Sequence, residues 1–163
     1  MTTLPRCTPE SVGISSDRLC DLLEHLSRLD SLNSIMVLRH GSVCLEGWWK
    51  PYAPHQPHML FSLSKSFVSA AIGIASGEGR LGVTDKLAGF FPEYADRITD
   101  DRMRDMALHD LLSMASGHAA CATSAMMGDP DHNYVQGFLS SSLTYPPGEH
   151  FCYNSAATYM LAA

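Results

Sequence analysis

The residues of this sequence most able to do chemistry are Ser62 and Lys65, a serine and a lysine three positions apart. Side chains with this spacing share one face of a helix, so the amine could help to make the hydroxyl nucleophilic without a histidine. Ser62 follows a proline-rich loop and is expected to begin a helix. Its backbone N–H would then be unpaired and able to stabilise a developing oxyanion. The motif alone is equally consistent with a capping serine beside a solvated lysine.

A tyrosine far along the chain is the second candidate. Tyr153 follows a turn at residues 146–148 and precedes a helix predicted from residue 154. If its phenol lies near a lysine, the pKa of the phenol falls and the group can carry a proton to or from a reacting atom. A tyrosine in this position is more commonly a core residue, and the position of Tyr153 taken alone favours that interpretation.

Three further patterns are better explained by structure than by ligand binding. Residues 77–82 match Gly-x-Gly-x-x-Gly, but the dinucleotide fingerprint follows a strand and opens a helix. Here it follows a predicted helix, so we interpret it as a helix end and turn. The pair His55 and His58 and the run Asp129–His132 both contain a proline that opposes a helical face. No third ligand is placed by the spacing, so we expect no metal site.

Apolar spacing and turn residues predict the elements that must position these side chains. The front of the chain is expected to hold a helix and a β-hairpin, and the part from residue 61 onward to be mainly helical. The predicted elements are a helix from Ser15 or Ser16 to about Leu29, a hairpin at 35–45 around Gly41, a helix from Ser62 to Gly77, a short helix at 90–94 stopped by Pro92, a helix at 107–116, a loop at 118–133, a short helix at 133–142 and a helix from 154.

Composition narrows the class of protein. The chain has 163 residues, a net charge of -6 and 45% hydrophobic residues, which suits one ordinary domain with a packed core. The absence of a basic cluster disfavours nucleic acid and anionic membranes as partners, and no apolar run is long enough to span a bilayer. The five scattered cysteines and the lack of a recognisable leader favour a reduced, cytoplasmic protein. The apolar end at 159–163 lacks a helix stop signal, which suggests a piece of a longer protein.

Taken together, the sequence resembles the serine β-lactamase and penicillin-binding-protein superfamily, with its closest likeness to the class C β-lactamase-related group of D-alanyl carboxypeptidases and esterases. Ser62 and Lys65 match the Ser-x-x-Lys motif of this superfamily. Residues 153–155, Tyr-Asn-Ser, approach its Tyr-x-Asn motif in the same order and at a similar separation. Three stretches between the two motifs are also similar to sequence segments of the family: FFPEY, LLSMASGH and YPPG.

The resemblance implies an α+β fold of the β-lactamase/transpeptidase type, present here in part. Residues 1–163 are expected to form a single partial domain, in which 1–60 contribute a helix and the hairpin of an antiparallel sheet and 61–163 the mainly helical part. The C-terminal strands of the sheet are missing from the chain, and with them the third family motif, Lys/His-Thr/Ser-Gly.

The implied function is that of a serine hydrolase that works through an acyl-enzyme without metal or organic cofactor. Ser62 would be the nucleophile, and Lys65 and Tyr153 would share the roles of general base and general acid; which of the two takes the proton is left open. Ser155 stands where the family has asparagine and would orient the substrate or Lys65. Small-molecule esters, D-amino-acid peptides or β-lactams are the implied substrates, and the oligomeric state is not predicted.

Two other classes are compatible with the same residues. The serine at position 155 and the missing third motif are also expected of a non-catalytic scaffold member that serves as a binding module. An inactive fragment is the remaining alternative. It predicts exposed apolar surface on the hairpin and on the helix that starts at Ser62.

Overall fold

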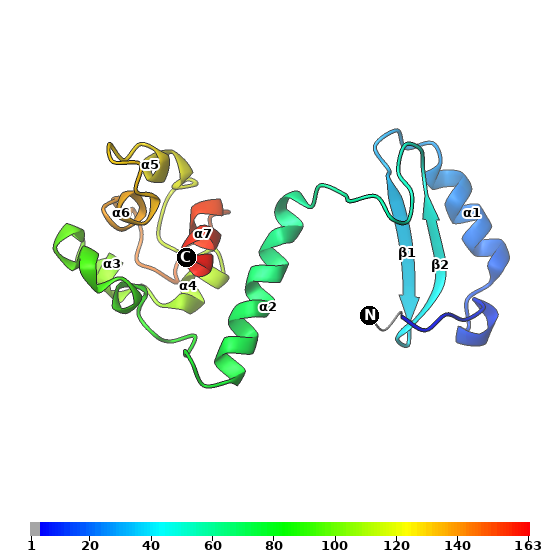
Figure 1. Ribbon diagram of the computed structural model, residues 1–163, viewed down its shortest axis with the longest axis horizontal. Coiled ribbons are helices and arrows are strands. Elements are labelled where there is room, and N and C mark those ends of the chain that lie inside the picture. The colour runs from blue at the N-terminus through cyan, green and yellow to red at the C-terminus, as the bar shows by residue number, and fades with distance from the viewer. Residues whose placement is uncertain (1–3) are drawn as a thin grey trace. The chain divides into compact units, whose positions relative to one another are not determined.

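The computed structural model describes residues 4–163 and divides into two compact units, one up to Met59 and one from Leu60 to Ala163. The first unit contains a short 3₁₀-helix, η1 (Glu10–Val12), helix α1 (Ser16–Leu26) and a two-stranded antiparallel sheet of β1 (Ser34–Arg39) and β2 (Ser42–Trp48) (Figure 1). The second unit holds the candidate site residues. Helices with a single antiparallel sheet are a partial α+β fold, as the sequence predicted.

The hairpin of the first unit forms because His40 and Gly41 both adopt positive φ angles, 49° and 76°. A two-residue turn of this kind matches the twist of the flanking strands. The pairing starts at Arg39 and Ser42, with one irregularity between Val37 and Leu38. The predicted hairpin and the preceding helix are therefore confirmed.

The second unit is built from helices only. Its 3₁₀-helices are η2 (Phe61–Leu63), η3 (Leu87–Phe90) and η4 (Pro92–Arg97); its α-helices are α2 (Ser64–Gly77), α3 (Asp101–Asp105), α4 (Leu108–Leu112), α5 (Thr123–Met127), α6 (Tyr134–Leu139) and α7 (Ser155–Ala162). Within residues 4–163, no helix combines the length and the apolar composition needed to cross a membrane.

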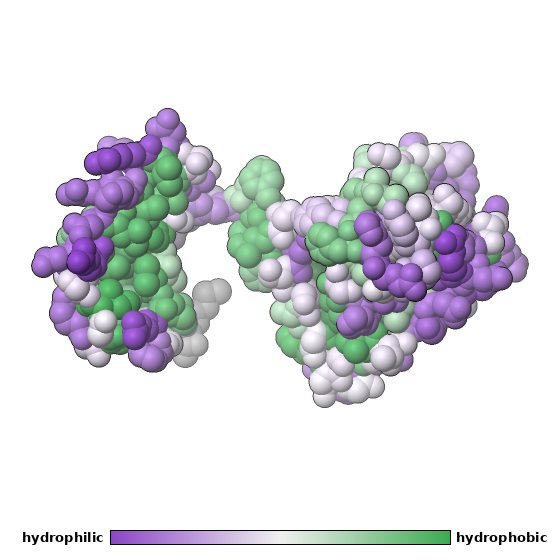
Figure 2. Space-filling model, turned by 180° about the vertical axis from the view of Figure 1, so that it is seen from behind, coloured by the Kyte–Doolittle hydropathy of each residue, from purple (hydrophilic) through white to green (hydrophobic). Residues whose placement is uncertain are grey.

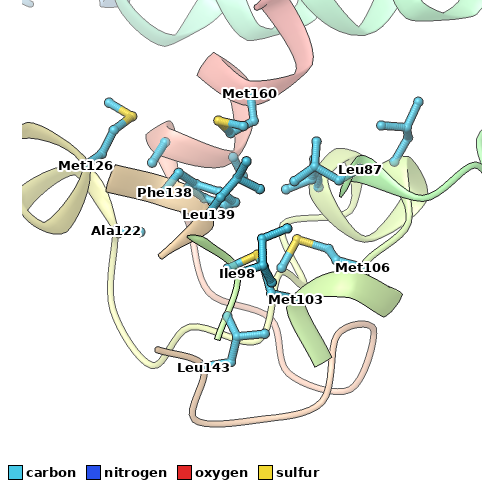
Figure 3. Packing of buried hydrophobic residues seen from close by; sticks show 14 residues of the cluster. Leu87, Ile98, Met103, Met106, Ala122, Met126, Phe138, Leu139, Leu143 and Met160 are labelled. Atoms are coloured by element: carbon cyan, nitrogen blue, oxygen red, sulfur yellow. The ribbon is translucent and has the colours of Figure 1, made fainter. Parts of the chain in front are cut away.

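One hydrophobic core holds the second unit together. Its side chains come from the segment between α2 and α3, from the short helices and from α7 (Figure 3). The side chains buried there include Leu87, Ile98, Met103, Met106, Leu111, Met126, Phe138, Leu139 and Met160. Because α4, α5 and α6 all contact α7, this core fixes where α7 begins, and Tyr153 lies just before that point.

Three predicted boundaries are wrong. The helix expected at 107–116 ends at Leu112, because Met114 has a φ of 57° and turns the chain away. Pro92 begins η4 instead of only stopping a helix, since proline fits the first turn, where its missing N–H is not needed. The expected loop at 118–133 contains α5, whose Met126 is buried in the core. By contrast, α6 forms inside the predicted 133–142, α7 starts beside residue 154, and residues 77–82 end α2 with Gly79 at a φ of 71°.

Both units expose apolar side chains (Figure 2). On the hairpin these are Met36 and Leu38, and on η2 and α2 they are Leu63, Phe67 and Ile74. The last three share one helical face. This is the uncovered surface that the inactive-fragment alternative predicts for the hairpin and the Ser62 helix.

Candidate active site

The junction of η2 and α2 brings Ser62 and Lys65 together. Lys65 Nζ lies 3.3 Å from Ser62 Oγ, within reach of a hydrogen bond. The residue before the serine, Phe61, adopts a φ of 45°. A bulky residue keeps this left-handed conformation only when its surroundings impose it, and such outliers concentrate at functional sites.

Ser62 presents its backbone as well as its side chain. Within the described residues, its N–H donates to no backbone or side-chain acceptor, whereas the next N–H, that of Leu63, bonds to the Leu60 carbonyl at 3.0 Å. Ser62 is also exposed. The amide is therefore free to donate to an oxyanion held beside Ser62 Oγ.

Tyr153 reaches the same hydroxyl from a segment 91 residues away. Its Oη donates a hydrogen bond to Ser62 Oγ at 2.6 Å, and Lys65 Nζ lies 4.8 Å from the centre of its ring. Two motifs that are distant in sequence thus meet at one oxygen atom. The tyrosine is half exposed and is not a core residue, contrary to the more common reading of such a position.

The surroundings of Tyr153 lower the pKa of its phenol below the ordinary value of 10.0. The largest cause is the hydrogen-bonding contribution of Lys65, followed by that of Ser62; Ser155 makes a smaller contribution in the same direction. All three favour the phenolate because they donate to it or carry positive charge. The phenolate is the form that can take a proton from serine.

The residue that anchors this arrangement is Asn154, which the sequence analysis did not single out. It is fully buried and caps α7: its Oδ1 accepts hydrogen bonds from the N–H groups of Ala156 and Ala122, each at 3.1 Å. Its Nδ2 donates to Ser116 Oγ at 3.2 Å. Asparagine directly before a predicted helix is a capping signal that could have identified it.

Residues 114–118 hold in place the segment that leads to Tyr153. The Met114 carbonyl accepts from Cys152 N–H at 2.8 Å, and the Gly117 carbonyl accepts from Tyr145 N–H at 2.9 Å. Gly117 has a φ of 84°, and a Cβ placed there would lie 2.4 Å from the Tyr145 carbonyl oxygen. Only glycine permits this approach, which gives the family-like stretch at 111–118 a structural role.

Ser155 is the first residue of α7 and is exposed. Its N–H donates to Cys121 Sγ at 3.4 Å. Its hydroxyl makes the smallest of the contributions that lower the pKa of the Tyr153 phenol. Its expected roles, to orient the substrate or Lys65, stay predictions.

The metal-like patterns lie elsewhere. In the part of the chain that the structure describes, no three histidine, cysteine or acidic side chains gather as metal ligands do. Asp129 instead accepts hydrogen bonds from the N–H groups of Asp131 and Asn133 and from Gln136, at 3.0 to 3.1 Å. In the first unit, His58 stacks on Tyr52.

The partial α+β fold and the meeting of the two motifs at Ser62 have the form of a β-lactamase-type hydrolase. The Beta-lactamase family model matches residues 33–163. The chain therefore belongs to the Beta-lactamase family, within a superfamily of serine hydrolases, and the resemblance seen in the sequence is confirmed.

Two comparisons name relatives. The chain is 31% identical over 83 residues to the 6-aminohexanoate-dimer hydrolase of Paenarthrobacter ureafaciens, a match that covers 51% of this chain and 21% of the relative. It is similar in fold to the solved structure of "Putative 6-aminohexanoate-dimer hydrolase from Bacillus anthracis", with a TM-score of 0.68 and 18% identity over 99% of this chain and 47% of that one. The chain thus spans less than half the length of these relatives.

Proposed function

We propose that Ser62 is the nucleophile of a serine hydrolase that forms an acyl-enzyme. The observation that carries the proposal is the position of Ser62 Oγ, which receives hydrogen bonds from Tyr153 Oη at 2.6 Å and from Lys65 Nζ at 3.3 Å. A nucleophile within hydrogen-bond reach of its base, with a third group to tune that base, is the arrangement that activates a hydroxyl.

Tyr153 is the better candidate for the base. Its lowered pKa increases the phenolate fraction at neutral pH, and deprotonation turns its hydrogen bond with Ser62 from donor to acceptor. The positive charge of Lys65, close to the ring, stabilises that phenolate. In this scheme Lys65 acts through its charge and Tyr153 moves the proton.

The reaction then runs in two halves. As Ser62 Oγ attacks a carbonyl carbon, Tyr153 takes its proton, and the carbonyl oxygen becomes an oxyanion to which Ser62 N–H donates. Tyr153 returns the proton to the leaving alcohol or amine, and the bond to the leaving group breaks. In the second half, water gives a proton to Tyr153 and attacks the acyl-serine. As the bond to Ser62 Oγ breaks, Tyr153 returns that proton to Ser62 Oγ and the acid is released.

The class of carbonyl substrate is proposed from the same site and from the names of the relatives. Esters, amides, D-amino-acid peptides and β-lactams all fit an exposed serine of this kind. Because both relatives bear the name 6-aminohexanoate-dimer hydrolase, a short linear amide is the first substrate to test beside a p-nitrophenyl ester. The proposed chemistry uses side chains and water only.

Labelling by a fluorophosphonate tests the nucleophile. The full-length protein should gain one adduct, and mass spectrometry should place it on the peptide that carries Ser62. Ser62→Ala should remove the label. An adduct that persists in Ser62→Ala, or that maps to another serine, would refute the assignment. A folded protein that shows no labelling and no ester turnover would favour the non-catalytic binding module.

A further inference from the structure

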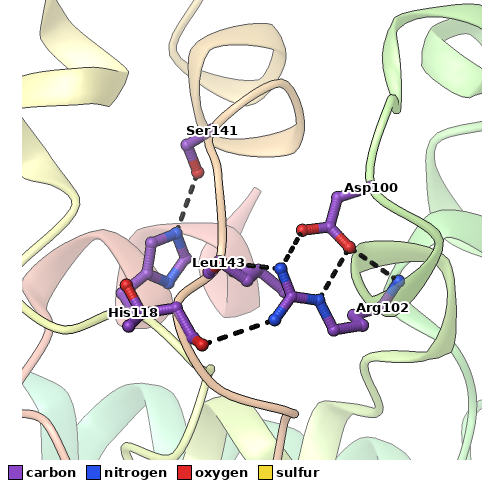
Figure 4. A network of polar contacts seen from close by, with 6 residues as sticks. Asp100, Arg102, His118, Ser141 and Leu143 are labelled. Atoms are coloured by element: carbon purple, nitrogen blue, oxygen red, sulfur yellow. Dashed lines mark hydrogen bonds and ion pairs between the residues drawn. The ribbon is translucent and has the colours of Figure 1, made fainter.

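A buried histidine that the proposed reaction does not use lies beneath the site. His118 is 5% exposed, and its ring contacts two serines. Nε2 lies 2.8 Å from Ser141 Oγ (Figure 4), and Nδ1 lies 3.0 Å from Ser116 Oγ. Phe138 packs against the ring with centroids 5.2 Å apart. The imidazole is therefore held on both nitrogens in a site without room for substrate.

The surrounding donors and acceptors determine its protonation. Ser141 Oγ donates its proton to the Phe138 carbonyl at 2.6 Å, so it can only accept from His118, and Nε2 must carry the proton. Ser116 Oγ already accepts from Asn154 Nδ2 at 3.2 Å, so its proton is free for His118 Nδ1. Every group is satisfied when His118 is neutral, and burial lowers the pKa of the imidazole in the same sense.

This chain of hydrogen bonds ends beside Tyr153. Asn154 is the neighbour of Tyr153, and it is held by Ser116 on one side and by the start of α7 on the other. The residue before Tyr153, Cys152, is fixed by the Met114 carbonyl, which belongs to the same 114–118 segment. The backbone on both sides of Tyr153 thus depends on the segment that carries Ser116 and His118.

We propose that neutral His118, through Ser116 and Asn154, is a positioning residue that holds the Tyr153 phenol against Ser62. The inference rests on the proposed function, because it concerns the base of that reaction. Loss of the imidazole frees the Ser116 hydroxyl to turn away from Asn154. The phenol then leaves the 2.6 Å contact with Ser62 for part of the time. A displacement of about 1 Å at a base costs on the order of 100-fold in rate.

The experiment measures fluorophosphonate labelling of the full-length protein, in which Ser62 Oγ attacks phosphorus and fluoride leaves. A range of reagent concentrations separates the maximal rate constant from the half-saturating concentration. His118→Leu fills the cavity without hydrogen bonds, and we expect about a 10- to 100-fold loss in the maximal rate with less than a threefold change in half-saturation. His118→Gln can still donate to Ser141 and accept from Ser116, and we expect it to recover most of the rate.

Asn133→Ala is the matched control. Asn133 caps α6 by accepting from Gln136 N–H at 3.0 Å and donates to Tyr94 Oη at 2.7 Å. None of its hydrogen bonds joins the chain that runs from His118 through Ser116 to Asn154. Asn133→Ala should lower the melting temperature and leave the maximal labelling rate unchanged. If His118→Leu lowers the rate no more than Asn133→Ala does at equal loss of stability, His118 is only structural and the proposal is wrong.

Two further results keep the outcomes distinct. If His118→Leu does not fold, Ser116→Ala breaks the same chain with a smaller change in volume, and it must show the same loss of maximal rate; a rate within twofold of the unsubstituted protein overturns the inference. If instead Ser62→Ala is still labelled, the proposed function fails, and it fails independently of anything measured at His118.

Discussion

Two serine clusters in the second unit use similar residues in opposite ways. Ser62 meets a tyrosine and a lysine at an exposed site, whereas Ser116 meets a histidine and an asparagine in a fully buried one. A search for a serine beside a histidine would have selected Ser116. The structure excludes it as a nucleophile, because no substrate can reach it.

The clusters also differ in how fully their hydrogen-bonding capacity is used. Within residues 4–163, no buried side-chain nitrogen or oxygen lacks a hydrogen-bond partner, and this includes the buried cluster. At the exposed cluster, the Ser62 N–H has no protein acceptor among the described residues and the phenol has a perturbed pKa. A saturated network holds a shape, whereas an open one can bind and react. We therefore propose support as the role of the first cluster and chemistry as the role of the second.

Removal of each serine gives the largest contrast. Ser62→Ala should lower the turnover of a p-nitrophenyl ester by roughly 10³-fold or more, because the acyl-enzyme cannot form. Ser116→Ala should keep Ser62 reactive and lose at most the 10- to 100-fold expected from a displaced phenol. Steady-state turnover of both proteins checks this. Equal losses would remove the distinction between the two clusters.

Substitution of Lys65 separates its charge from any role as a base. Activity should rise with pH as Tyr153 ionises, and the lowered pKa of the phenol should bring this rise below pH 10.0. Lys65→Ala removes the main cause of the lowered pKa, so the rise should move to higher pH, with a loss at neutral pH of about 100-fold. The measurement is kcat/KM against pH.

Lys65→Arg is the discriminating control for that profile. Arginine keeps the positive charge but does not lose its proton in proteins. Substantial activity in Lys65→Arg would support Tyr153 as the base. A loss as large as in Lys65→Ala would instead make Lys65 the base and would contradict the proposed order of proton transfer. Tyr153→Phe should abolish the rise in kcat/KM with increasing pH.

Glycine replacements compare the packing of the 114–118 segment with that of helix α2. Gly117→Ala should destabilise the protein by about 3 kcal/mol, because alanine is strained at a φ of 84° and its Cβ would meet the Tyr145 carbonyl. Gly73→Ala, in α2, meets nothing within 4 Å and should stabilise the helix by about 0.5–1 kcal/mol. Chemical denaturation measures both. A similar effect at the two positions would show that the support is not tightly packed.

Acid should lower the free energy of unfolding through the buried cluster, by a smaller amount than the substitution at Gly117. Burial lowers the pKa of His118 from its ordinary value of 6.5, so the unfolded chain binds this proton more readily than the folded one. The stabilisation is complete above pH 6.5 and is lost as the pH falls toward the lowered pKa of the folded state, with a slope of at most about 1.4 kcal/mol per pH unit. Asp100 and Arg102 form a salt bridge with each other, and Arg102 also donates hydrogen bonds to the carbonyls of residues 143 and 144 (Figure 4).

His118→Gln is the control for this pH dependence. Because the chain contains seven other histidines, the quantity to compare is the difference in unfolding free energy between His118→Gln and the unsubstituted protein at each pH. That difference should shrink on acidification. If it stays constant from pH 7.5 to 5, the imidazole is not buried as a neutral group.

Local chemistry in the sequence determined several features of this protein. The spacing of Ser62 and Lys65 already required a shared helical face, the apolar run and glycine at 35–45 already required a hairpin, and the motifs together already indicated the family. These features depend on neighbours within a few residues or on recognisable sequence motifs. They could therefore be predicted without a partner from elsewhere in the chain.

Only the tertiary structure decided what Tyr153 and Asn154 do. The phenol meets Ser62 across 91 residues, and this contact exists because α7 is packed against α4, α5 and α6 and capped by a buried asparagine. The role of Gly117 and the neutral state of His118 likewise follow from atoms that are distant in sequence. Sequence spacing constrains residues that share an element, whereas packing alone determines which elements meet and which side chains lose contact with water.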